Sequence, residues 1–322
     1  MRIAVFGAGA IGGYIAAKLA GAGHAVSVVA RGPHLQAMRD RGLVLDDGGA
    51  VRTLRLRATD RAEELGPQDL VVIATKAHAL PDAAPAVASL IGADTVLLPA
   101  QNGIPWWFPY RAGAPLEGRP IAAADPDGSL MRHLDPARVI GCVVYMAAIV
   151  PEPGRVRFFT GNRLVLGEPD GGASQRLARL AEVLTAAGIK IETTERIRDA
   201  VWMKLWGNVA FNPLSVLTGA DMKRMADDPG VLSVIRAVMR ECQAVADRLG
   251  TRFDIDVDAR LADARRLGAF KTSMLQDYEA GRPIELAPLV GAVIELGRTA
   301  GVQTPMLDAV DALTRMRATP QA

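Results

Sequence analysis

Short runs of aliphatic and β-branched residues recur through the first half of the chain at the length of buried strands. They lie at 2–6, 25–30, 70–74 and 96–98, and the segment 14–22 between the first two has helical propensity. Such runs are typical of strands buried on both faces, and their alternation with helical segments is typical of parallel βαβ units. The pattern therefore predicts an α/β N-terminal domain.

Other stretches of this half predict β structure of a different kind. Runs at 43–45 and 53–56 flank Asp46-Asp47-Gly48-Gly49, which favours a hairpin over a βα unit. A longer apolar run at 139–149 is more ambiguous, and 189–192 is the last strand-like run.

From about residue 195 the hydrophobic spacing becomes helical. Apolar residues recur every four positions along one predicted helix face: Ile197, Val201, Leu205 and Val209. With 322 residues, the chain has the length of two domains. We therefore predict one domain at 1–194 and an all-α second domain at 195–322.

A stripe of polar residues lies one position out of phase with this apolar face. Lys204, Asn208 and Asn212 share the stripe. Asparagine is a poor choice for a helix interior, so ligand binding is favoured over the alternative of a solvated face. Because Pro213 follows Asn212, the helix is expected to end near that point.

Composition excludes several classes of function. The formal net charge is only +2, whereas a nucleic-acid-binding protein would show a strong basic excess. The longest apolar run, 140–150, is too short to span a bilayer. Cys142 and Cys242 are far apart, and no His, Cys and carboxylate residues have zinc-site spacing, so neither a disulfide framework nor a metal site is predicted. We expect a cytoplasmic protein that binds neither nucleic acid nor a membrane.

A glycine motif stands between the first predicted strand and the helix that follows it. It is Gly7-Ala8-Gly9-Ala10-Ile11-Gly12, a G-x-G-x-x-G in the strand–turn–helix context of a dinucleotide site. Gly7 permits the tight turn, Gly9 lets the backbone approach a pyrophosphate, and Gly12 lets helix and strand pack closely. The glycines also argue against a signal peptide in this stretch. A glycine-rich turn without a ligand is the weaker alternative.

The end of the second strand distinguishes the two nicotinamide cofactors. An NAD site usually has an acid there for the ribose 2′-hydroxyl, but residues 27–36 contain none. Arg31 follows the strand instead, and an arginine there can pair with a 2′-phosphate, so NADP is favoured over NAD. A solvated loop arginine is the alternative. Lys76 and Asn102-Gly103, which follow the next two buried strands, are further candidates for ligand contacts.

A second polar cluster lies closer to the C-terminus. It contains Ser273 within the run 271–277, and Glu285 ahead of an amphipathic segment at 286–301. Glu285 is thus placed near a predicted helix N-terminus, where a carboxylate is favoured. A capping-region carboxylate with no further function is the plain alternative.

Taken together, these motifs resemble the ketopantoate reductase (2-dehydropantoate 2-reductase) family from Gly7 to about Pro305. The strongest signature is W-x-K-L-x-x-N-x-x-x-N-P, present as Trp202-Met203-Lys204-Leu205 through Asn208 to Asn212-Pro213. The other matching elements are the glycine motif, Lys76, Asn102-Gly103, Ser273–Asp277 and Glu285.

The resemblance implies an α/β Rossmann-type N-terminal domain followed by an all-α C-terminal domain of the 6-phosphogluconate dehydrogenase C-terminal-like type. It implies an oxidoreductase that uses NADPH to reduce a 2-oxo acid, foremost 2-dehydropantoate (ketopantoate) to pantoate in pantothenate biosynthesis. Residues 1–194 would then bind NADP, residues 195–322 would hold the small-molecule substrate, and a homodimer is compatible with the family.

The resemblance also assigns roles to single residues. In that family the lysine that matches Lys204 is the proton donor, or general acid, and the glutamate that matches Glu285 lies beside substrate and cofactor. Lysine, unlike arginine, can release a proton, and this chain has only six lysines and no histidine after residue 133. The remaining implied roles are substrate binding by Asn208, Asn212 and Ser273, binding of the 2′-phosphate side by Arg31 and Lys76, and binding of the nicotinamide side by Asn102.

Three features depart from the family pattern and leave the substrate open. Met222 and Phe270 fall where polar substrate contacts are expected, and Trp106-Trp107 makes the loop after Asn102 unusually aromatic. A bulkier or more apolar 2-oxo acid is therefore an alternative substrate. Reduction of a 3-oxo acid, or a non-catalytic protein that senses NADP(H), are the alternative functions.

Overall fold

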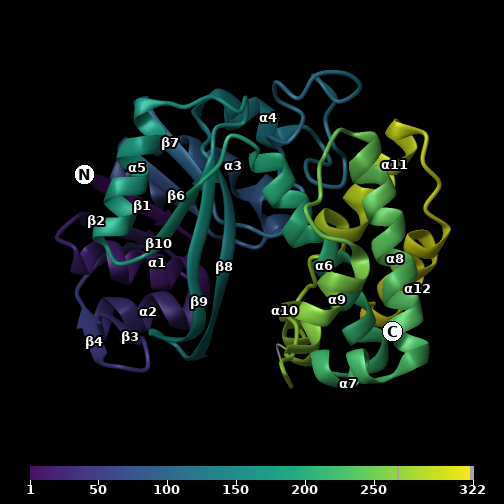
Figure 1. The fold of residues 1–322 in the computed structure, drawn as a ribbon. Coiled ribbons are helices and arrows are strands. Elements are labelled where there is room, and N and C mark those ends of the chain that lie inside the picture. Colours follow the sequence, from purple (N-terminus) through teal and green to yellow (C-terminus); the bar gives the residue numbers. More distant parts are fainter. Residues whose placement is uncertain (267, 320–322) are drawn as a thin grey trace. The chain divides into compact units, whose positions relative to one another are not determined.

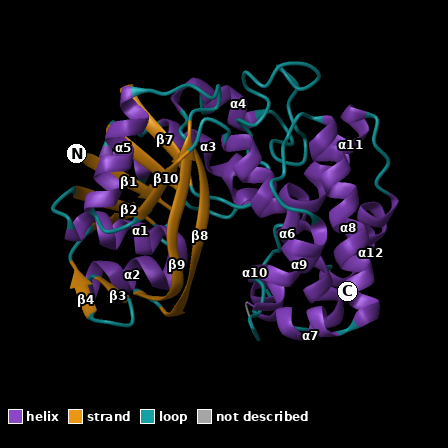
Figure 2. Cartoon of the chain, viewed as in Figure 1, coloured by secondary structure: helices purple, strands orange, loops and turns teal. Residues whose placement is uncertain are grey.

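The chain folds into two compact units in a computed structural model that describes residues 1–266 and 268–319 (Figure 1). The first unit contains Met1–Ala112 and Asp127–Ile197. The second contains the described residues from Arg198 onward together with Gly113–Pro126. Among the described residues, strands occur only in the first unit (Figure 2).

A five-stranded parallel sheet forms the centre of the first unit, in the order β5-β2-β1-β6-β7. Every neighbouring pair in it is parallel, as the alternating pattern predicts. Its strands are β1 (Arg2–Phe6), β2 (Ala25–Val29), β5 (Arg57–Thr59), β6 (Gln68–Ile73) and β7 (Ile91–Pro99). The helices α1 (Ala10–Gly21), α2 (Gly32–Arg41) and α3 (Leu80–Ala88) follow β1, β2 and β6. The carboxyl ends of β1, β2, β6 and β7 therefore lie along one edge of the sheet, where open α/β sheets bind ligands.

A second, mixed sheet completes the first unit. Its strands are β3 (Leu43–Asp46), β4 (Val51–Leu54), β8 (Gly141–Glu152), β9 (Arg155–Gly167) and β10 (Lys190–Thr193). The pair β3–β4 is antiparallel, which confirms the predicted hairpin. The long antiparallel pair β8–β9 resolves the ambiguous run at 139–149 as a strand and adds a partner strand that the sequence pattern did not predict.

Helix α1 packs against strands of both sheets. Its apolar residues share one core with β1 and with β9, for example Ile15 with Val5 and Leu164. Tyr14 is buried, its hydroxyl donates to Asn162 Oδ1 at 2.9 Å, and burial raises the pKa of Tyr14 to about 12. Tyr14 thus joins α1 to β9 as a structural residue.

The first unit also contains α4 (Ser129–His133) and α5 (Gln175–Ala186), with short 3₁₀ turns η1 (Ala62–Leu65), η2 (Ala77–Ala79) and η3 (Pro136–Arg138). Ser174 caps α5, because its hydroxyl accepts a hydrogen bond from the N–H of Leu177. Arg176 holds the buried carboxylate of Glu168 next to this cap.

All the regular secondary structure in the described part of the second unit is helical. Its elements are α6 (Ile197–Thr218), α7 (Met222–Asp227), α8 (Pro229–Arg248), α9 (Val257–Arg266), α10 (Ser273–Glu279), the π-helical turn η4 (Ala287–Gly291), α11 (Ala292–Ala300) and α12 (Pro305–Ala318). The predicted fold class, a parallel-sheet N-terminal domain followed by a helical domain, is confirmed.

The predicted end of the long helix at Asn212 is wrong. Helix α6 continues through Pro213 to Thr218. Proline disfavours a helical conformation in the residue before it and removes one N–H donor. Here Pro213, Leu214 and Val216 are all buried, so their packing stabilises the continued helix against that local preference.

The segment Gly113–Pro126 belongs to the second unit although it lies between β7 and α4 in the chain. The carboxylate of Glu295 on α11 accepts hydrogen bonds from the N–H groups of Ala122 at 2.8 Å and Ala123 at 2.9 Å. A single carboxylate therefore anchors this segment to the helical unit through its backbone.

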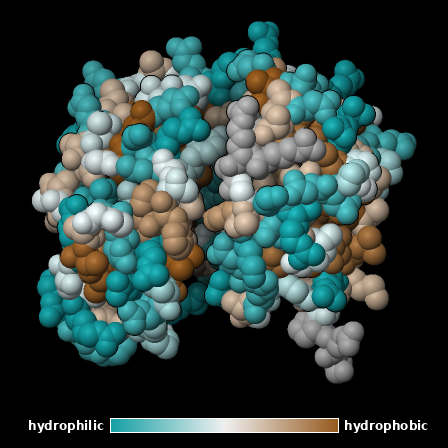
Figure 3. Space-filling view, turned by 60° about the horizontal axis from the view of Figure 1, so that its bottom comes forward, coloured by the Kyte–Doolittle hydropathy of each residue, from teal (hydrophilic) through white to brown (hydrophobic). Residues whose placement is uncertain are grey.

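Among the described residues, no helix has the length and apolar character needed to cross a bilayer. On the face shown in Figure 3, hydrophobic residues form small patches separated by polar ones.

Candidate functional site

The glycine motif forms a turn from the end of β1 to the start of α1. Gly7 has φ +95°, and a Cβ there would lie 2.6 Å from the Thr75 nitrogen. A Cβ at Gly12 would lie 2.0 Å from the Gly7 oxygen. A Cβ at Gly9 would meet nothing within 4 Å. Gly7 and Gly12 are therefore required by packing, whereas Gly9 leaves the backbone open to a ligand.

The N-terminus of α1 has the features of an anion site. Gly9 is its N-cap residue, no side chain caps it, and its first turn contains no acidic residue. Unpaired N–H groups and the positive end of the helix dipole favour a phosphate at such a terminus. The open backbone at Gly9 therefore fits a dinucleotide pyrophosphate.

Arg31 is an exposed residue that lies one residue beyond the end of β2, after Ala30, and is the N-cap residue of α2. Within the described residues, its guanidinium forms no hydrogen bond or ion pair. Each of the other arginines between 31 and 61 has a guanidinium that binds a carbonyl or carboxylate oxygen: Arg39, Arg41, Arg52, Arg55, Arg57 and Arg61. Arg31 is thus a cation left available at the sheet edge, as a 2′-phosphate ligand would require.

Lys76 and Asn102 follow the carboxyl ends of the next two parallel strands. Lys76 is exposed and is the N-cap residue of η2, and Asn102 is half-buried. Gln101 ties the two loops together, because its Nε2 donates to the Thr75 carbonyl at 2.8 Å. The glycine turn, Arg31, Lys76 and Asn102 therefore follow neighbouring strands at one edge of the sheet.

Lys204, Asn208 and Asn212 lie on one face of α6, as their spacing predicts. Lys204 and Asn208 are half-buried, and Asn212 is almost fully buried. A buried asparagine side chain must be hydrogen-bonded to be tolerated. The degree of burial therefore argues against the alternative of a fully solvated face.

A chain of hydroxyl groups joins this helix to α10. Ser215 Oγ donates to the Asn212 carbonyl at 2.6 Å and lies 2.6 Å from Thr272 Oγ1. Thr272 is the N-cap residue of α10, and its hydroxyl accepts from the Leu275 N–H at 3.1 Å. Ser273, the exposed first residue of α10, is held next to this cap. The sequence analysis missed Ser215 and Thr272, although a threonine ahead of a helix is an N-cap signal.

We predict that Ser215→Ala disturbs substrate binding more than turnover. The variant leaves the buried Thr272 hydroxyl without this partner, which should lower the free energy of unfolding by about 1–3 kcal/mol. The family resemblance implies that Asn212 and Ser273 bind the substrate, and both lose a shared anchor in this variant, so KM for the 2-oxo acid should rise several-fold, with a smaller change in kcat. Urea unfolding and steady-state kinetics measure the two effects. Ser233→Ala is the control, since Ser233 is exposed and, among the described residues, its hydroxyl bonds only to the carbonyl of Gly230 on its own helix.

Glu285 lies two residues before the π-helical turn η4 and directly before its N-cap residue, Leu286. The residue is 6% exposed. A carboxylate that only complements a helix terminus on the surface would be solvated, so this burial favours a more specific role. Single π-helical turns within helices are frequent at functional sites.

The aromatic loop does not line an open site. Trp106, Trp107 and Phe108 are all buried. Trp106 donates to the Leu134 carbonyl at 3.2 Å, and a Cβ at Gly141 would approach the Trp107 ring to 2.9 Å. These side chains therefore pack inside the first unit and give no reason to expect a bulkier substrate.

The other two departures lie together in the second unit. Met222 is buried at the start of α7, and its N–H donates to the carbonyl of Phe270 at 2.9 Å. The Phe270 side chain is 42% exposed. The hydrogen bond between the two residues joins the start of α7 to the segment that precedes α10.

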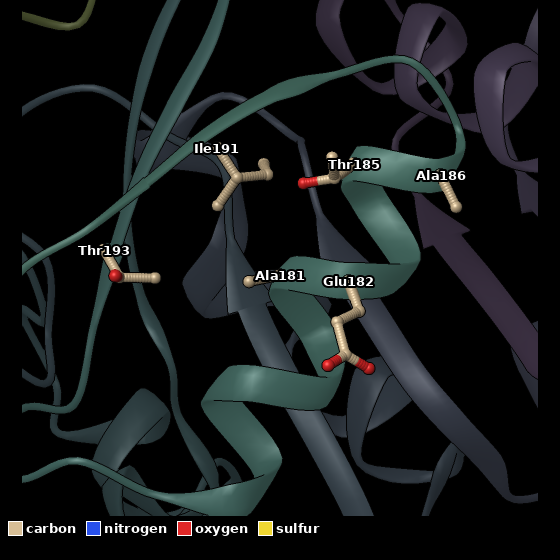
Figure 4. Close-up of a pocket in the computed structure, with 6 residues that line it drawn as sticks. All are labelled: Ala181, Glu182, Thr185, Ala186, Ile191 and Thr193. Carbon is tan, nitrogen blue, oxygen red and sulfur yellow. The ribbon is translucent and has the colours of Figure 1, made fainter.

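A pocket in the first unit contains none of the predicted site residues (Figure 4). It lies between α5 and β10, and Figure 4 shows the Thr185 hydroxyl pointing towards Ile191. Its lining has one carboxylate and no cation, which does not suit an anionic substrate. In the part of the chain that the structure describes, no group of His, Cys, Asp and Glu residues could hold a metal ion.

Comparison with known proteins shows the family. The model "Ketopantoate reductase PanE/ApbA" matches residues 3–171, and the model "Ketopantoate reductase PanE/ApbA C terminal" matches residues 196–318. The chain belongs to the ketopantoate reductase family. The resemblance seen in the sequence motifs is thereby confirmed.

Individual family members match over nearly the whole chain. A 2-dehydropantoate 2-reductase of Mesorhizobium japonicum is 48% identical over 316 residues, which cover 98% of this chain and 97% of that protein. A crystal structure of a Ralstonia solanacearum MolK2 protein has a TM-score of 0.94 and 46% identity, with 98% and 97% coverage. The 2-dehydropantoate 2-reductase of Methylococcus capsulatus has a TM-score of 0.82 and 31% identity, with 100% and 99% coverage.

Proposed function

We propose that this protein is a 2-dehydropantoate 2-reductase that uses NADPH to reduce ketopantoate to pantoate. The observation that carries the proposal is the match to a protein of that name over 98% of the chain. The geometry supports the cofactor, because an open glycine turn and an arginine without a partner among the described residues follow adjacent strands of one sheet.

Each domain has its own part in the reaction. Residues 1–194 bind NADP, with Gly7, Gly9 and Gly12 at the pyrophosphate, Arg31 and Lys76 at the 2′-phosphate side, and Asn102 at the nicotinamide side. Residues 195–322 hold the 2-oxo acid and carry the proton donor. Asn208, Asn212 and Ser273 bind the substrate through amide and hydroxyl groups, which suit its carboxylate and oxygen atoms.

Lys204 supplies the proton of the reduction. Bound in this site, NADPH would supply a hydride to the carbonyl carbon, and negative charge would then develop on the carbonyl oxygen. The Lys204 ammonium stabilises that charge and transfers a proton to the oxygen, which yields the hydroxyl group of the product. The resulting neutral amine regains a proton from water. Glu285 orients the ammonium and balances its charge.

A substrate panel tests the function. NADPH oxidation is followed with ketopantoate, with 2-oxo acids of larger and more apolar substituents, and with 3-oxo acids. We expect the highest kcat/KM with ketopantoate. A higher kcat/KM for another 2-oxo acid would show that ketopantoate is not the preferred substrate. A preference for 3-oxo acids would show that the enzyme catalyses a different reaction. Tight NADPH binding without turnover of any acid would favour the NADP(H)-sensing alternative.

The cellular setting follows from the same proposal. The enzyme acts in the cytoplasm in pantothenate biosynthesis, and a homodimer is compatible with its family. Cys142 and Cys242 are both free and buried, which is compatible with a reducing compartment. Light scattering during size-exclusion chromatography measures the oligomeric state.

A further inference from the structure

His34 joins three segments of the first unit through its two ring nitrogens. The residue lies in the first turn of α2 and is half-buried. Its Nε2 lies 2.7 Å from the Ala8 carbonyl oxygen in the glycine turn. Its Nδ1 accepts a hydrogen bond from the Gly154 N–H, 2.9 Å away, in the turn between β8 and β9.

The chemistry of the two partners fixes the proton on the ring. A backbone N–H can only donate, so Nδ1 must carry no proton. A carbonyl oxygen can only accept, so Nε2 must carry the proton and donate it to Ala8. The two bonds together therefore select the Nε2–H tautomer of His34.

The anchor for this ring is itself firmly held. Gly154 has φ +83°, and a Cβ there would come within 2.9 Å of Ala37 Cβ on α2. The Gly154 carbonyl accepts from the Val44 N–H of β3 at 2.8 Å. The β8–β9 turn is thus packed against both α2 and β3, and His34 transmits that fixed position to the glycine turn.

Holding the Ala8 carbonyl determines where the Gly9 N–H points. The two groups belong to one planar trans peptide, so they point in opposite directions. Among the described residues, the Gly9 N–H has no hydrogen-bond acceptor. Gly9 is also the position where the backbone is open. The bond from His34 therefore points the Gly9 N–H away from the His34 ring, in a direction where no described residue accepts it.

We propose that His34 is a positioning residue, which orients the Ala8–Gly9 peptide so that its N–H can bind the pyrophosphate of the cofactor. This inference rests on the proposed binding of NADP(H). It differs from the role of Arg31, because the pyrophosphate is common to NADPH and NADH whereas the 2′-phosphate is not.

The test is to titrate His34→Phe with NADPH and with NADH and to monitor binding by the fluorescence of each dinucleotide. Phenylalanine keeps a planar ring and removes both hydrogen bonds. We expect Kd to rise roughly tenfold for NADPH and by the same factor for NADH, the scale of one hydrogen bond to a charged group. Adenosine 2′-monophosphate has no pyrophosphate, so its Kd should not change. His34→Gln retains one donor and one acceptor and should recover part of the loss.

His24→Phe is the matched control. His24 is also half-buried, but it follows the C-terminal end of α1, whereas the glycine turn lies at the N-terminal end of that helix. The Kd values of His24→Phe should therefore equal those of the unsubstituted protein. Unchanged dinucleotide binding by His34→Phe would overturn the inference and leave the proposed function intact. A loss confined to NADPH would also overturn it. Failure of the unsubstituted protein to bind either dinucleotide would instead refute the proposed function.

A measurement on the unsubstituted protein covers the case in which His34→Phe does not fold. Long-range ¹H–¹⁵N spectra distinguish the tautomers of a histidine ring. We expect the His34 signals of the Nε2–H form at neutral pH, before any cofactor is added. Signals of the Nδ1–H form or of the imidazolium would overturn the inference.

Discussion

Lys204→Ala should lower kcat by about 10²–10⁴-fold, the usual scale for loss of a general acid. The alkoxide that hydride transfer builds would then have to take its proton from water, without a cation held nearby. The substrate would still be bound by Asn208, Asn212 and Ser273, so KM should change less than kcat. Steady-state NADPH oxidation at saturating ketopantoate measures both constants.

Two further variants separate the charge of Lys204 from its proton. Lys204→Arg keeps the cation but cannot release a proton, so it should remain well below the activity of the unsubstituted enzyme. Lys223→Ala should be fully active, because Lys223 is exposed and its ion pair with Asp227 lies on the surface of α7. Turnover of Lys204→Ala close to the unsubstituted rate would refute the mechanism.

The structure distinguishes Lys204 from the other lysines of the helical unit. Lys271 is exposed and pairs with Glu279 at 2.7 Å, and Lys223 is exposed and pairs with Asp227. Lys204 alone among these three is half-buried, on the same helix face as Asn208. Its location therefore matches the role that the family resemblance implies.

Local sequence signals predicted the parts of the fold that local physics determines. The short β-branched runs form β1, β2, β6 and β7, and the Asp-Gly segment forms the turn of the β3–β4 hairpin. Both were predictable because hydrophobic periodicity and turn-forming residues can be recognised within a few positions. Strand β9 was not predicted, because its thirteen residues mix exposed and buried positions. Its antiparallel pairing with β8 determines that this segment is a strand.

Tertiary packing decided the other differences. Helix α6 passes Pro213 because the residues beyond it are buried, and Gly113–Pro126 belongs to the second unit because Glu295, far along the chain, binds its backbone. No local pattern contains either fact.

The candidate site also combines residues that local sequence predicts with residues that only the tertiary structure reveals. Motif residues could be found along the chain, but the residues that position them are distant partners. Ser215 and Thr272 are 57 residues apart, and His34 and Gly154 are 120 residues apart. Such pairs are determined by the fold, so they become visible only in three dimensions.

Arg31→Asp should weaken NADPH binding by about 100-fold and leave NADH binding nearly unchanged. A hydrogen bond to a charged group contributes about 1.5–3 kcal/mol, which corresponds to about 10–100-fold in Kd, and the new carboxylate adds repulsion against the 2′-phosphate. The effect is selective because NADH has a 2′-hydroxyl at that position. An aspartate can accept a hydrogen bond from this hydroxyl, as it does in NAD enzymes.

Fluorescence titrations with the two dinucleotides measure this change in preference. Arg57→Asp is the matched control, since Arg57 lies on the neighbouring strand β5 but its guanidinium is bound to the Glu64 carbonyl at 2.8 Å. Equal losses for NADPH and NADH in Arg31→Asp would contradict the assignment of Arg31 to the 2′-phosphate. The ratio of the two losses also separates Arg31 from His34, because only a contact to the pyrophosphate affects both dinucleotides alike.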